Sequence, residues 1–94
     1  MNELSRLKPK ILRVLRKHHV KRAGIFGSYA RGEQNKRSDV DILVETPKGI
    51  SLYDFIGIKL ELEDSLKKRV DLVQYTAIKP LLRERILADE VRLL

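Results

Sequence analysis

The stretch Asp39-Val-Asp-Ile-Leu-Val-Glu45 decides the fold of this chain, because it is the clearest β-strand in the sequence. A polar, strongly charged loop leads into it, and a proline and a glycine end it shortly afterwards. Side chains on a strand alternate between its two faces, so Asp39 and Asp41 should point the same way where the loop enters the sheet. Two carboxylates would then converge at one edge of the sheet.

Converging carboxylates repel one another unless a cation neutralises them, and Mg²⁺ is a hard cation that prefers oxygen ligands. A second strand, Val70-Asp71-Leu-Val-Gln-Tyr75, carries Asp71 among apolar residues, where burial would be costly without a cation. We therefore expect Asp39, Asp41 and Asp71 to be catalytic residues that hold two Mg²⁺ ions ~4 Å apart. Taken alone, an Asp-x-Asp pair at a strand start is also commonly a solvated pair.

Gly27-Ser28 follows a third predicted strand, Val20 to Phe26, and indicates a turn that caps a short helix running through Ala30 and Arg31. Glycine lets a phosphate approach the backbone, and the start of a helix offers free N–H groups. Arg31 follows about one turn later, where its guanidinium could reach a triphosphate oxygen. Gly27, Ser28 and Arg31 are thus predicted nucleotide-binding residues, although Gly-Ser alone usually marks only a helix cap.

Three longer helices complete the pattern. Apolar residues at helical spacing predict one near the N-terminus, with a basic outer face, and another after the capping box of Ser51 and Asp54. The last should begin at Pro80 and end at about Ala88, before a short terminal strand, Val91 to Leu94. The order αβαβαβα predicts an α/β fold, a small sheet flanked by helices in one domain spanning residues 1–94, with the strand order left open.

Composition and charge indicate which classes of partner the protein can bind. The formal net charge is +7, and residues 1–38 hold 11 of the 20 Lys and Arg residues against only Glu3 and Glu33. A basic surface favours anionic partners such as a nucleotide, a nucleic acid or an acidic protein. Cysteine is absent, no signal region opens the chain, and no apolar run approaches a membrane span. We expect a cytoplasmic protein without a membrane partner.

Gly27-Ser28-Tyr-Ala-Arg31-Gly32, Ser38 to Glu45, Val70 to Val73 and the closing segment Lys79 to Leu87 together resemble the minimal nucleotidyltransferase family of the polymerase-beta superfamily. The resemblance covers nearly the whole chain. It implies the small nucleotidyltransferase fold with a mixed sheet, ATP as nucleotide donor, and a partner. Members are similar to the antitoxins of HEPN-domain ribonuclease toxins, which transfer AMP from ATP to a toxin tyrosine. A cognate HEPN-domain toxin in a hetero-oligomer is therefore the expected partner.

Several alternatives remain beside adenylylation. A non-catalytic antitoxin could mask a partner's active site with the basic first helix or the apolar end Val91 to Leu94. A small-molecule transferase would normally need added helices for its acceptor, and 94 residues leave little room for them. Nucleic acid is not expected as the primary partner, because interleaved aromatic residues and a recognition motif are lacking.

Overall fold

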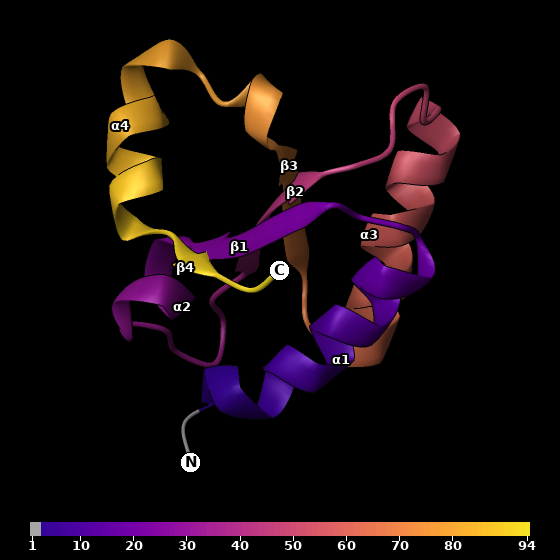
Figure 1. The fold of residues 1–94 in the computed structure, drawn as a ribbon. Helices are drawn as coiled ribbons and strands as arrows, with labels where there is room; N and C mark the ends of the chain where they lie inside the picture. The colour runs from indigo at the N-terminus through magenta and orange to yellow at the C-terminus, as the bar shows by residue number, and fades with distance from the viewer. Residues whose placement is uncertain (1–2) are drawn as a thin grey trace.

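The computed structural model describes residues 3–94, and Figure 1 shows how helices and strands follow one another along this part of the chain. The elements are α1 (Glu3–Lys17), β1 (Arg22–Phe26), α2 (Gly27–Arg31), β2 (Val40–Glu45), α3 (Leu52–Leu66), β3 (Val70–Gln74), the 3-10 helix η1 (Tyr75–Ala77), α4 (Pro80–Asp89) and β4 (Val91–Arg92). The predicted order αβαβαβα is confirmed, and the predicted short terminal strand is present as β4, which ends at Arg92 rather than Leu94.

The strands form one mixed sheet in the order β3-β2-β1-β4. β1 is antiparallel to β2 and to β4, whereas β2 and β3 are parallel, with Asp41 opposite Asp71. The predicted mixed sheet is confirmed, and the structure supplies the strand order that the sequence left open. Because β1 runs opposite to β2 and β3, the last residue of β1 and the first residues of β2 and β3 lie at the same end of the strands.

Helices cover the two faces of this sheet unequally. α1 and α3 lie together on one face (Figure 1), where alternate strand residues such as Ile25, Ile42 and Leu72 join the main apolar core. The opposite face carries Leu43 in a smaller cluster with residues of η1 and α4. The second face is therefore less filled, and it is the face on which Asp41 lies, since strand side chains alternate.

The boundaries differ from the sequence prediction by a few residues. β2 begins at Val40, so Asp39 precedes the strand, and β1 begins at Arg22 rather than Val20. α1 starts at Glu3 and continues through Pro9. The hydroxyl of Ser51 accepts a hydrogen bond of 3.0 Å from the Asp54 amide, as the capping box predicts. Within residues 3–94, no helix combines the length and apolarity needed to span a bilayer.

Candidate active site

Asp41 and Asp71 are the centre of the candidate site. They are direct partners in the register of β2 and β3, so their side chains project from the same face of the sheet. On its other side, Asp41 lies opposite Phe26, the last residue of β1. The structure therefore brings the two predicted ligands together at the edge where all three strands meet.

The pKa of Asp41 reports its burial and the charges around it. Burial raises this pKa from its ordinary value of 3.8 to about 6, and the negative charges of Asp71 and Asp39 add to the increase. The guanidinium of Arg31 acts in the opposite direction. Three acids and one base from three separate segments of the chain thus share a single electrostatic environment.

Asp39 contributes to this environment but is turned toward a different partner. Its Oδ1 lies 3.1 Å from the Nε of Arg69, and this oxygen is buried without an aligned hydrogen bond. No group of three acidic or histidine side chains within residues 3–94 is spaced as a ready-formed metal site. The three aspartates are neighbours that do not form a ready-made metal site, and one oxygen of Asp39 is engaged by Arg69.

The chemistry of these donors nevertheless suits Mg²⁺. All three candidate ligands are carboxylates, which supply the hard oxygen atoms that this ion prefers. Burial and the neighbouring charges of Asp71 and Asp39 both raise the pKa of Asp41, and a bound cation would favour its ionised form. The assignment of Asp39, Asp41 and Asp71 as metal ligands stays a prediction with this physical support.

Gly27 joins the predicted phosphate turn to the aspartates. Its φ of +71° is in the left-handed region, and a Cβ at this position would overlap the carboxylate of Asp41. α2 begins at Gly27, one residue earlier than predicted, and no side chain caps its first turn. Ser28 therefore lies within that turn, whose first residue, Gly27, lies beside Asp41. A glycine is required here for space as well as for backbone conformation.

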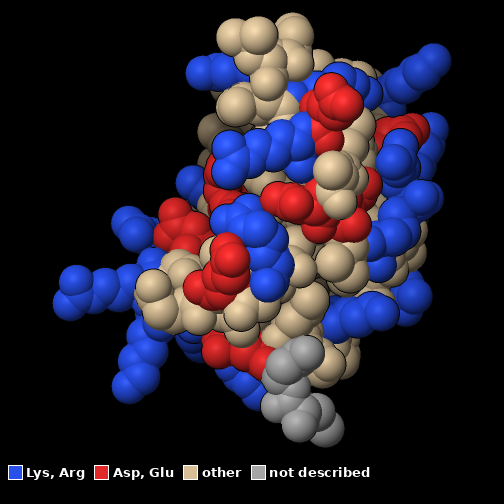
Figure 2. All heavy atoms as spheres, turned by 90° about the vertical axis from the view of Figure 1, so that its left-hand side faces the viewer, with Lys and Arg blue, Asp and Glu red and all other residues tan. Residues whose placement is uncertain are grey.

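Arg31 is at the end of α2, and two carboxylates hold it. Its Nε lies 2.8 Å from Glu33, and its Nη1 lies 3.1 Å from Asp89 at the end of α4. Figure 2 shows the side of the molecule that carries α2 and α4, where acidic and basic side chains are interspersed. The contact to Asp89 was not predicted, because 58 residues separate the pair and no local pattern signals it.

A second cluster missed by the sequence analysis fixes the end of α4 to the sheet. The Tyr75 hydroxyl donates a hydrogen bond to Glu90, and Arg22 lies over the tyrosine ring at 4.2 Å from its centroid. Arg22 also lies 3.7 Å from Glu90. Burial, followed by the contact with Glu90, raises the pKa of Tyr75 well above its ordinary range, so the hydroxyl stays protonated. This cluster positions α4 and hence Asp89 beside Arg31.

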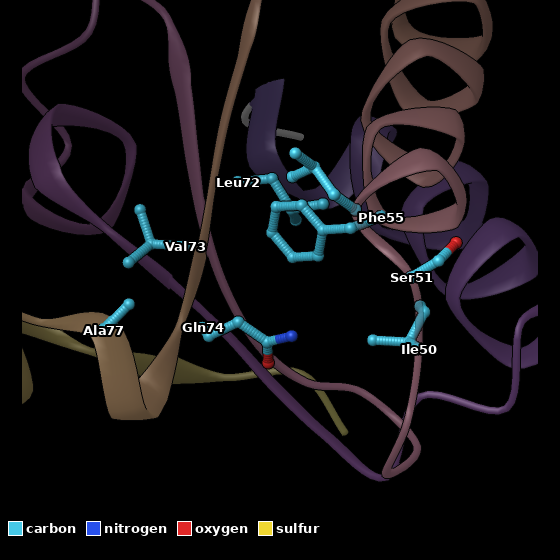
Figure 3. Close-up of a pocket in the computed structure, with 8 residues that line it drawn as sticks. Ile50, Ser51, Phe55, Leu72, Val73, Gln74 and Ala77 are labelled. Atoms are coloured by element: carbon cyan, nitrogen blue, oxygen red, sulfur yellow. The ribbon is translucent and has the colours of Figure 1, made fainter.

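An apolar pocket lies away from these residues. It has a volume of about 350 Å³ and lies between the start of α3 and the open edge of β3. Phe55 and Ile50 line it from one side, while Leu72, Val73 and Gln74 line it from the strand (Figure 3). None of the six predicted site residues contributes to its wall. This apolar pocket is therefore separate from the aspartates.

Comparison with protein families identifies the family of this chain. Residues 9–94 match the family model described as polymerase beta, nucleotidyltransferase. The chain belongs to this family. A nucleotidyltransferase transfers a nucleoside monophosphate, a reaction for which clustered aspartates opposite a glycine turn are well suited.

Relatives of this nucleotidyltransferase carry more specific names. A Methanocaldococcus jannaschii protein named as a candidate protein adenylyltransferase is 53% identical over 97% of this chain and 98% of its own length. The protein adenylyltransferase MntA of Thermococcus cleftensis is 43% identical over 77% of this chain and 73% of its own.

Solved structures agree with this assignment of the fold. A candidate minimal nucleotidyltransferase that is 38% identical superposes with a TM-score of 0.80 and covers 94% of this chain and 90% of its own. A toxin-antitoxin complex solved with AMP-PNP contains a chain that is 26% identical, with a TM-score of 0.81, over 93% of this chain and 72% of that one. The nucleotidyltransferase fold predicted from the sequence is confirmed.

Proposed function

We propose that this nucleotidyltransferase is a protein adenylyltransferase that transfers AMP from ATP to a tyrosine of a cognate HEPN-domain toxin and so acts as an antitoxin. The observation that carries the proposal is the pairing of Asp41 with Asp71 beside Gly27, which has no side chain to fill the space next to the Asp41 carboxylate. Relatives named as protein adenylyltransferases over most of the chain support the choice of a protein acceptor. The relative solved with AMP-PNP in a toxin-antitoxin complex supports ATP and the toxin.

The proposed role of each site residue follows from its position in the fold. Gly27 and Ser28 would receive the triphosphate at the uncapped start of α2, and Arg31 would neutralise part of its charge. Asp39, Asp41 and Asp71 would hold two Mg²⁺ ions, which when bound supply a more reactive acceptor oxygen and stabilise charge on the phosphates. In the reaction the tyrosine hydroxyl loses its proton to solvent, a bond forms between its oxygen and the α-phosphorus, the α-β anhydride bond breaks, and pyrophosphate leaves.

The test is transfer of label from α-labelled ATP, with Mg²⁺, to the protein encoded beside this chain, co-purified with it. We expect label on the partner with the wild type, and at least ~100-fold less with Asp39→Asn plus Asp41→Asn, because both changes remove charged oxygen ligands. Glu84→Gln, an exposed change on α4, is the control and should retain transfer. Absence of labelled partner with the wild type would refute the proposal.

A non-catalytic antitoxin is the second candidate, and one observation favours it. α3 exposes a row of large apolar side chains four residues apart, Leu52, Ile56 and Leu60, which are 73%, 45% and 56% exposed. Such a stripe can cover a partner surface without chemistry. The apolar C-terminal end is less suited than expected, because Leu93 and Leu94 pack against the core. Neutralisation that persists in the Asp39→Asn, Asp41→Asn variant would support masking.

A further inference from the structure

A basic pocket opens beside Asp39 on the side of the site away from Gly27. Its volume is about 340 Å³, and it is formed by two loops, residues 36–39 before β2 and residues 67–69 before β3. Its walls include five cationic side chains: Lys36, Arg37, Lys67, Lys68 and Arg69. Among residues 3–94, Asp39 is the only acidic residue of its wall. An anionic ligand is the natural occupant of such a pocket.

The sheet order places this pocket on the acceptor side of the site. The strands run β3-β2-β1, so the loop preceding β3 and the α2 turn following β1 lie on opposite sides of Asp41. If ATP takes the Gly27 turn, as in the proposed function on which this inference rests, the attacking hydroxyl must approach from the side of Asp71. The basic pocket adjoins that approach.

Salt bridges already satisfy part of the positive charge. Arg69 contacts Asp39 at 3.1 Å, Lys68 contacts Glu3 at 3.1 Å, and Lys67 contacts Asp64 at 3.5 Å. In contrast, Lys36 and Arg37 are exposed and form no salt bridge with any residue in the part of the chain that the structure describes. These two cations are available to a ligand without loss of an internal contact.

We propose that this basic pocket binds an acidic segment of the acceptor protein that flanks the reactive hydroxyl. Acidic side chains on both sides of the acceptor tyrosine would pair with Lys36 and Arg37 and would draw Arg69 away from Asp39. Charge complementarity of this type selects partners and orients them more than it adds affinity. Docking would thus place the hydroxyl at Asp71 and exclude acceptors with basic flanks.

Binding of synthetic peptides tests the proposal without ATP or Mg²⁺. Three fluorescein-labelled peptides carry one tyrosine flanked on each side by glutamates, glutamines or lysines. They are titrated into the wild type and into Lys36→Gln plus Arg37→Gln. The matched control is Lys8→Gln plus Arg13→Gln, which removes two exposed charges from α1, in pocket-lining residues remote from the aspartates. Both variants retain every salt bridge described above, so both should fold.

We expect the glutamate peptide to bind the wild type best and to lose about fivefold in affinity in the Lys36, Arg37 variant, with less than about twofold loss in the control. Equal losses in the two variants would overturn the proposal, because net charge would then explain binding. Tighter binding of a single-stranded oligonucleotide at the same two residues would also overturn it. Peptide binding and ATP-dependent labelling are separate measurements. If the peptides fail to bind as expected while label is still transferred, this inference fails and the proposed function stands.

Discussion

Replacing Asp41 by Asn should stabilise the metal-free protein at neutral pH while it abolishes transfer. Burial and the charges of Asp71 and Asp39 raise the pKa of Asp41 to about 6, so its ionised form is unfavourable in the folded state. Asparagine keeps the shape of the side chain and removes the charge. The same substitution deletes a charged oxygen ligand, so function and stability should change in opposite directions.

The magnitude follows from the size of the pKa shift. Displacement from 3.8 to about 6 corresponds to an upper bound of ~3 kcal/mol, at ~1.36 kcal/mol per pKa unit. Asp41 is only half-buried, and solvent screening reduces this to about 1 kcal/mol. Because the folded pKa is raised, this group's contribution is fully present below pH 3.8 and is lost as the pH rises through about 6. The advantage of the variant should appear across that window.

Urea and thermal unfolding in EDTA, at several pH values from 3.5 to 7.5, would measure the difference. At pH 7 the variant should melt about 4–8 °C above the wild type, and near pH 3.5 the two should coincide. Asp64→Asn, at an 85% exposed side chain on α3, is the control and should change stability by less than ~0.5 kcal/mol. A variant that is less stable than the wild type at pH 7 would refute the claim that the carboxylates repel.

Two further substitutions have matched controls. Gly27→Ala should reduce transfer by more than ~100-fold, because the added Cβ displaces the Asp41 carboxylate. The control is Gly49→Ala, which has a similar φ of +81° but no described atom within 4 Å of the added Cβ, so it should show only backbone strain of ~1 kcal/mol. Equal activity of the two variants in the labelling assay would contradict this reasoning. Tyr75→Phe should lower the free energy of unfolding in urea by ~1–3 kcal/mol, because Glu90 loses its hydrogen bond. The control is Tyr53→Phe at an exposed position, which should lower it by less than ~0.5 kcal/mol. Similar losses in the two variants would show that the hydrogen bond contributes little.

The parts of the site set by short-range patterns were predictable from the sequence. Alternation along residues 39–45 places Asp41 on one face of a strand, and Asp71 takes the paired position on the next strand. Parallel pairing then makes them neighbours in register. The burial expected for Asp71 from its apolar neighbours is wrong, because this residue of the edge strand β3 is exposed. Gly27 was predicted for the approach of a phosphate, and the structure adds that its missing Cβ makes room for Asp41.

Long-range contacts of the charged side chains could not be predicted in this way. Arg31 with Asp89, and Tyr75 with Glu90 and Arg22, depend on where α4 and β4 return to the sheet. That return is fixed by the strand order, which periodicity does not encode. The same limit applies to Arg69, whose contact with Asp39 follows from the parallel pairing of the strands beyond them.

These contacts explain how the aspartates are tolerated before any ligand binds. One guanidinium, that of Arg69, pairs with Asp39, and another, that of Arg31, lowers the pKa of Asp41 from the opposite side. Neither guanidinium neutralises the aspartates fully, because the pKa of Asp41 remains raised and Arg31 also pairs with two other carboxylates. The unmet negative charge is concentrated between Asp41 and Asp71, where no cationic side chain forms a salt bridge with either residue within residues 3–94. A divalent cation between Asp41 and Asp71 would relieve this repulsion, and the proposed transfer requires a cation at the same point.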